Sequence, residues 1–153
     1  MSKPRNLIEK LNTSQTLLGL DFGDKSIGIA VSDKSHTIAS PIKTIKRKGI
    51  SKDLKILFEI IEEYKVGALV FGLPLSLSGQ ENERTRKVRK FIEELTLKSN
   101  IFIELYDERF SSDIIFKELR KESISTSKIK KKIDQQAAAY ILQGFLDNAK
   151  NNY

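Results

Sequence analysis

A continuous apolar run in the middle of the chain, residues 66–74 with the sequence VGALVFGLP, constrains the fold most strongly. The run has the length of a strand, carries no charged side chain and ends at a proline. Strands that read as unbroken apolar runs are buried on both faces, which happens where helices cover both sides of a largely parallel sheet. The run therefore predicts an α/β protein with this strand inside it.

The order of the other predicted elements extends this pattern. Three strand-like segments come first, with the turn residues Gly23 and Asp24 between the first two, and helices then alternate with strands. This order predicts a mixed five-stranded sheet with an antiparallel meander on one side and helices on both faces. The predicted strands are 16–21, 27–33, 38–45, 66–74 and 100–110, and the predicted helices are 51–64, 81–98, 113–121 and 134–148.

The length of 153 residues suits one domain with its own core. We expect a polar N-terminal extension over residues 1–15 with one loose helical turn around Leu7, Ile8 and Leu11, a single domain over 16–149 and a short tail over 150–153. The segment 122–132, ESISTSKIKKK, is rich in lysine and serine, and it is predicted to be a mobile basic loop.

The composition limits the kinds of site and of binding partner that the chain can have. Lys and Arg outnumber Asp and Glu by 27 to 20, and the net charge of +7 favours a nucleic acid over a membrane as partner. The chain has no cysteine and a single histidine, His36, which excludes disulfides, thiolate metal sites and multi-histidine zinc sites. We recognise no secretory signal and no apolar stretch of membrane-spanning length, so a cytoplasmic location is expected.

Acidic residues lie at the ends of three predicted elements. Asp21 closes the first strand, Asp107 and Glu108 end the fifth, and Asp134 opens the last helix. Ligands of open α/β sheets bind at the carboxyl ends of parallel strands, where Asp21 and Glu108 would meet. Strand alternation lets only one of Asp107 and Glu108 point inward. An all-oxygen site of this kind suits Mg²⁺ or Mn²⁺ and can support phosphodiester hydrolysis.

Each acid also has an ordinary structural explanation. Asp21 is followed by Gly23, and an acid at this spacing is typical of a turn. Asp134 would be an acid in the first turn of a helix, where the backbone dipole favours it. Asp107 or Glu108 can pair with Arg109 at the surface. The residues alone leave both explanations open.

Four segments, LGLDFGDKSIGIAVSD, GLPLSLSGQENE, YDERFSS and KKKIDQQAAAYILQGFL, resemble the sequence blocks of the YqgF family, also called RuvX. The resemblance covers about residues 17–147, with the blocks in the family order. It implies a ribonuclease H-like fold and a metal-dependent endoribonuclease that processes the 5′ end of pre-16S rRNA. It assigns Asp21, Glu108 and Asp134 as the metal-binding and catalytic acids. The residues alone leave open whether Asp107 coordinates the metal in place of Glu108.

Basic residues near these acids are expected to bind the RNA of a pre-ribosomal particle. These residues are Lys25, Arg109, Lys128, Lys130, Lys131 and Lys132. Two other functions stay open, a Holliday-junction resolvase and a noncatalytic rRNA-binding factor. A nucleotide-binding protein of the actin and hexokinase type needs two such domains, for which the chain has no room. The oligomeric state, monomer or weak homodimer, is also open.

Overall fold

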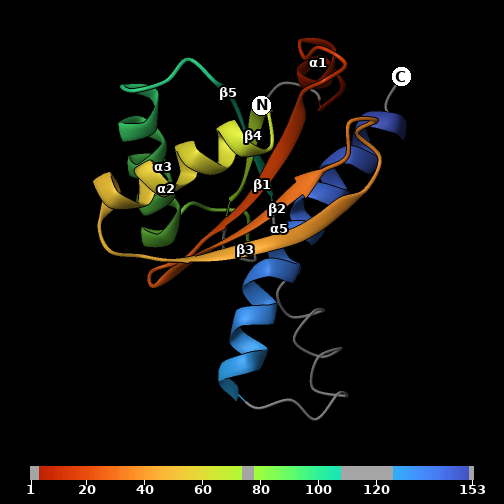
Figure 1. Cartoon of the computed structure of the whole chain (residues 1–153). Helices are drawn as coiled ribbons and strands as arrows, with labels where there is room; N and C mark the ends of the chain where they lie inside the picture. Colours follow the sequence, from red (N-terminus) through yellow and green to blue (C-terminus); the bar gives the residue numbers. More distant parts are fainter. Residues whose placement is uncertain (1–3, 74–77, 108–125, 152–153) are drawn as a thin grey trace.

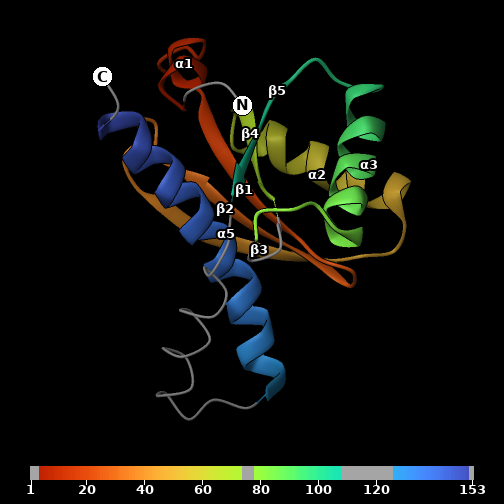
Figure 2. The ribbon, with the colours of Figure 1, turned by 180° about the vertical axis from the view of Figure 1, so that it is seen from behind.

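Residues 4–73, 78–107 and 126–151 are described by a computed structural model, in which a five-stranded sheet carries helices on both faces (Figure 1). Figure 2 shows the same elements from behind, with α5 crossing the face of the sheet opposite α2 and α3. In chain order the elements are α1 (Pro4–Glu9), β1 (Thr16–Phe22), β2 (Ser26–Ser32), β3 (Ala39–Lys46), α2 (Ile50–Glu63), β4 (Val66–Leu73), α3 (Glu83–Thr96), β5 (Phe102–Asp107) and α5 (Thr126–Asn151).

The strand order in the sheet is β3-β2-β1-β4-β5. Strands β1, β2 and β3 form an antiparallel meander, whereas β4 lies parallel to β1 and β5 lies parallel to β4. The predicted mixed sheet is therefore confirmed. Because β1, β4 and β5 run in the same direction, their carboxyl ends lie at one edge, where strand-borne acids can meet.

The central apolar run forms β4, which is buried at all eight positions. One core lies between the sheet and the helices α2 and α3, and includes Leu20, Leu57 and Phe91. A second core lies under α5 and includes Leu17 and Leu142. Successive residues of a strand therefore point into different cores. The core that a side chain joins shows from which face of the sheet it projects.

The helical turn expected in the N-terminal segment is present, and it packs against the domain. Residues Pro4–Glu9 form α1, and Leu7 is only 3% exposed, packed into the core under α5. Ile8 and Leu11 pack against the same core. The three apolar side chains follow helical spacing, which is the sequence signal for this contact. The predicted domain boundaries at residues 16 and 149 stay a prediction.

The predicted start of the last helix is wrong. Helix α5 begins at Thr126 and not at Asp134, so residues 126–132 continue the helix instead of forming a loop. The segment contains no glycine or proline, and lysine has good helix propensity, which outweighs the charge density on which the loop prediction depended. Residues 122–125 and the predicted helix 113–121 lie outside the described residues.

This correction removes one explanation of Asp134. The first turn of α5 contains no acidic residue, and Asp134 lies two turns further along the helix. A favourable interaction with the helix dipole is confined to the first turn, so it does not account for this acid. In the part of the chain described here, no helix is long and apolar enough to cross a membrane.

Candidate metal and nucleic-acid site

Asp21 lies on the face of the sheet that α5 covers. Its neighbours Leu20 and Phe22 point into the core under α2 and α3. By strand alternation Asp21 shares the opposite face with Leu17, which contacts the α5 core. Its side chain is half-buried. Asp21 therefore faces the helix that carries Asp134.

Two glycines let the backbone of α5 lie directly on this face. A β-carbon added to Gly28 would lie 1.8 Å from the carbonyl oxygen of Asp134. A β-carbon added to Gly19 would lie 2.9 Å from the carbonyl oxygen of Ala138. Gly28 is the residue that pairs with Asp21 across β1 and β2. The contact therefore places Asp134 over the row of the sheet that contains Asp21.

A hydrogen bond fixes the carboxylate of Asp134 at this position. The Ser26 hydroxyl donates to Oδ2 of Asp134 over 2.6 Å. Ser26 opens β2 two residues before Gly28, so its side chain projects from the same face. The sequence prediction missed Ser26. The only sequence signal was that Ser26 lies two residues before Gly28 and so on the same face of β2. This spacing matters only because α5 packs on that face.

Of the two acids that end the fifth predicted strand, the structure describes Asp107. Asp107 is the last residue of β5 and pairs with Leu73. Leu105 packs against the core under α2 and α3, whereas Tyr106 packs against α5, so alternation puts Asp107 on the face away from α5. Glu108 and Arg109 lie outside the described residues. Among the side chains that the structure describes, no group of three or more His, Cys, Asp or Glu can hold a metal ion.

Tyr106 holds the far end of α5 against the sheet. Its hydroxyl accepts a hydrogen bond from the Asn148 side chain over 2.7 Å, and its ring meets Phe145 edge-on with the ring centres 6.1 Å apart. Burial raises the pKa of the Tyr106 hydroxyl, so the residue stays neutral. Tyr106 therefore has a packing role beside the site.

A buried ion pair supports the β1–β2 turn from the other face. Asp53, in the first turn of α2, has no exposed surface, and it accepts hydrogen bonds from Arg47 Nε over 3.3 Å and from the Lys48 backbone over 2.9 Å. The Arg47 guanidinium lies 4.4 Å from the ring centre of Phe22, the residue after Asp21. The sequence did not reveal this pair, because its members belong to different elements and carry no distinctive motif.

The same turn is tied to α3 at its surface. Lys87 Nζ lies 2.8 Å from Oδ1 of Asp24, and this hydrogen bond and charge hold the pKa of Asp24 below its ordinary value. Two contacts thus stabilise the turn after Asp21: Arg47 packs against Phe22 on the core side, and Lys87 pairs with Asp24 at the surface.

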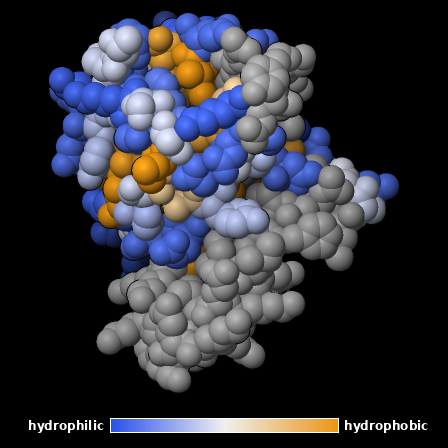
Figure 3. Space-filling model, turned by 90° about the vertical axis from the view of Figure 1, so that its right-hand side faces the viewer, coloured by the Kyte–Doolittle hydropathy of each residue, from blue (hydrophilic) through white to orange (hydrophobic). Residues whose placement is uncertain are grey.

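The predicted nucleic-acid-binding residues are only partly described. Lys25 lies exposed in the β1–β2 turn. Lys128, Lys130, Lys131 and Lys132 lie on the first two turns of α5, but their side chains are outside the described part of the molecule. Among the described residues visible in Figure 3, hydrophilic residues predominate, with hydrophobic areas between them. The role of these lysines stays a prediction.

Comparison with known sequences gives a consistent set of relatives. A protein of Paramagnetospirillum magneticum named "Putative pre-16S rRNA nuclease" is 41% identical over 145 residues, which cover 95% of this chain and 94% of the relative. A protein of Clostridioides difficile with the same name is 44% identical over 131 residues, which cover 86% of this chain and 93% of the relative.

Several solved structures with a similar fold are Holliday-junction resolvases of low sequence identity. Thermus thermophilus RuvC in complex with Holliday junction substrate matches with a TM-score of 0.54 at 13% identity, over 87% of this chain and 94% of RuvC. The yeast mitochondrial Holliday junction resolvase matches with a TM-score of 0.54 at 12% identity, over 97% of this chain and 86% of the resolvase. The ribonuclease H-like fold predicted from the sequence is confirmed.

The sequence profile of the RuvX family, described as "Holliday junction resolvase", matches residues 15–148. This match spans β1 to α5 and contains both placed acids, Asp21 and Asp134. The family predicted from the four sequence segments is therefore confirmed, and this chain belongs to the RuvX family.

Proposed function

We propose that this chain is an endonuclease that hydrolyses phosphodiester bonds at the 5′ end of pre-16S rRNA, with a divalent metal ion held by Asp21, Glu108 and Asp134. The observation that carries the proposal is the contact of Asp134 with Gly28, the residue paired with Asp21. The contact supports the proposal because it joins the segment of α5 that carries Asp134 to the strand pair that carries Asp21, more than a hundred residues away in the sequence.

The donor atoms fit Mg²⁺ or Mn²⁺. Both ions prefer carboxylate oxygens, and the chain offers no thiolate. His36 contacts the carbonyl of Gln15 through Nε2 over 2.8 Å, beyond the start of β1 and therefore at the opposite end of that strand from Asp21. Glu108 is favoured over Asp107 as the third acid, because Asp107 falls on the face away from α5.

The residues of the chain have distinct tasks in this proposal. Strand β1 holds Asp21, while Gly28 and Ser26 fix the backbone and the carboxylate of Asp134. A bound divalent ion supplies positive charge for the phosphate and lowers the pKa of a coordinated water. The hydrolytic water therefore needs no histidine base, and none is offered by the described side chains near Asp21.

The choice of RNA as substrate follows from the names of the relatives and from charge. The relatives from Paramagnetospirillum magneticum and Clostridioides difficile are named for pre-16S rRNA. A net charge of +7 favours a polyanion. A pre-ribosomal particle as partner and a cytoplasmic location belong to the same proposal.

Replacing Asp21 or Asp134 with Asn tests the proposal. Each variant keeps the size of the side chain and removes its charge, so we expect loss of Mn²⁺ binding by calorimetry and at least about 100-fold slower cleavage of a precursor 16S rRNA fragment. Asp33→Asn is the matched control, because Asp33 follows the far end of β2. A wild-type chain that binds the fragment without cutting it in Mg²⁺ or Mn²⁺ supports the noncatalytic RNA-binding alternative instead.

A second candidate function is resolution of Holliday junctions. The description of the RuvX family and the fold shared with Thermus thermophilus RuvC both favour it. A resolvase cuts four-way DNA symmetrically as a dimer. Cleavage of a synthetic four-way junction in preference to the rRNA fragment, together with a dimer in sedimentation, would support this function over the first.

A further inference from the structure

Lys46 ends β3 and lies next to the residue that holds Asp134. Ser26 and Lys46 are paired across β2 and β3, and the Ser26 hydroxyl donates to Asp134 over 2.6 Å. Paired residues of antiparallel strands project from the same face, with β-carbons about 4.5–5.5 Å apart. The lysine is therefore one strand away from the hydrogen bond that fixes the acid of α5.

The direction of the Lys46 side chain is determined by its two neighbours. Ile45 is 1% exposed in the core under α2 and α3. Arg47 is held on the same face by its ion pair with Asp53 and its contact with Phe22. Ile45 and Arg47 therefore both project from the face of the sheet that α2 covers. By strand alternation Lys46 projects from the opposite face, on which α5 lies.

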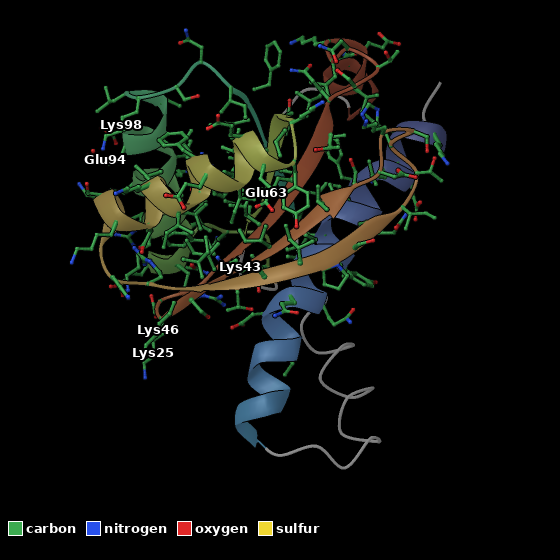
Figure 4. The ribbon with its side chains drawn as sticks, in the orientation of Figure 1. Lys25, Lys43, Lys46, Glu63, Glu94 and Lys98 are labelled. Carbon is green, nitrogen blue, oxygen red and sulfur yellow. The ribbon has the colours of Figure 1, made fainter. Side chains whose placement is uncertain are left out.

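Lys46 is exposed and is accompanied by a second lysine. The carbonyl of Lys25 accepts a hydrogen bond from the Arg47 backbone over 2.9 Å, so the two lysines lie on neighbouring segments. Figure 4 shows Lys25 and Lys46 pointing away from the body of the molecule near the β1–β2 turn, whereas Lys43 lies on the α2 side of β3. No side chain in the described part of the chain forms an ion pair with Lys46 or Lys25.

We infer that Lys46, together with Lys25, binds a backbone phosphate of the RNA strand beside the phosphate to be cleaved. The inference rests on the proposed function and adds a substrate-binding residue to the same site. Two ammonium groups that no described acid neutralises can bind a phosphate, and such contacts position the nucleic acid without reading its sequence. Strand β3 thereby sets the path of the RNA past Asp21 and Asp134.

Binding of a precursor 16S rRNA fragment in EDTA tests this inference apart from catalysis. We expect Lys46→Ala to weaken binding about 3- to 10-fold and to lower the slope of log affinity against log salt by about 0.7–0.9, the value for one lost phosphate contact. Lys46→Arg should restore both values. Lys43→Ala is the matched control, because it removes the same charge from the same strand on the other face, and it should leave both within about twofold of wild type.

Several outcomes would overturn the inference. If Lys46→Ala binds RNA with the affinity and salt dependence of the wild type, the contact is excluded. If Lys43→Ala loses as much RNA affinity as Lys46→Ala, the loss is a general effect of charge. Loss of Mn²⁺ affinity in Lys46→Ala shows that the substitution disturbs the acids instead of the RNA. Tighter Lys46-dependent binding to a four-way DNA junction than to the rRNA fragment excludes RNA as the partner. A chain that binds RNA through Lys46 but never cuts it supports this inference and contradicts the nuclease proposal.

Discussion

Substitution of Gly28 by alanine should disturb stability and metal binding together. The added β-carbon would lie 1.8 Å from the carbonyl oxygen of Asp134 and 2.4 Å from the carbonyl carbon, and both atoms belong to the helix backbone. Ordinary contact begins near 3.4 Å, so α5 must retreat from β2 by about 1.6 Å at this point. No rotamer change can relieve this clash, because no flexible side chain takes part in it.

The size of the effect follows from this displacement. Overpacking a core costs about 1–3 kcal/mol, and a backbone clash belongs at the upper end of that range. A domain of this size loses about 2–4 °C in Tm for each kcal/mol, so a decrease of about 5–10 °C is expected. In the proposed site Asp134 would hold the ion, and Mg²⁺ requires its oxygen ligands in a strict geometry, so a retreat of the helix would weaken metal binding. A misplacement of about 1 Å is enough to slow catalysis about 100-fold.

Thermal unfolding with and without Mn²⁺, together with calorimetric titration of Mn²⁺, measures both effects. Gly19→Ala is the matched control, since its β-carbon would meet the Ala138 carbonyl at 2.9 Å, one helical turn beyond Asp134. It should lower Tm but change Mn²⁺ affinity less than Gly28→Ala does. Wild-type Tm and Mn²⁺ affinity in Gly28→Ala would refute the inference that this glycine positions the acid.

Three further variants test the surroundings of the site. Ser26→Ala should weaken Mn²⁺ binding about 10-fold in calorimetry, since a hydrogen bond to a charged group contributes about 1.5–3 kcal/mol, and Ser26→Thr should keep the affinity. Asp53→Ala should lower the free energy of unfolding in urea by about 3 kcal/mol, because it leaves the Arg47 guanidinium largely buried without its partner. Hydrogen bonds from the backbone N–H groups of Thr37 and Ile38 hold the pKa of Asp33 below its ordinary value of 3.8. Their stabilisation is present above that value and is lost as the pH falls through the lower folded pKa, so Tm between about pH 5 and 2 should fall more steeply in wild type than in Asp33→Asn.

The sheet could be predicted from the sequence because its signals are local. The apolar run 66–74 indicates a buried strand without reference to any other segment, and the turn at Gly23 and Asp24 joins two strands that pair directly. The start of α5 could not be predicted in the same way. A run of lysines is compatible with a loop or a helix, and nothing within 126–134 decides between them except the absence of a breaker.

The acids could be named from the sequence, but their surroundings could not. Asp21 and Asp134 belong to recognisable segments, whereas Ser26 acquires its role only because α5 crosses β2 at Gly28. The ion pair of Arg47 and Asp53 depends equally on how α2 follows β3. Such contacts join residues that are neighbours in space alone, and no local pattern reports them.

The packing of α5 also explains how an acid can lie on the sheet side of a helix. At Gly28 the carbonyl of Asp134 occupies the space that a β-carbon would fill, so the backbone and not the carboxylate makes the closest contact. The carboxylate is thereby left half-buried and reaches Ser26. A metal ion that binds only this folded arrangement stabilises the protein by about 2.7 kcal/mol at a concentration about 100 times its Kd. Variants that move α5 should therefore lose the Mn²⁺-dependent part of Tm, whereas Asp53→Ala, which acts on the opposite face, should lower Tm equally with and without the ion.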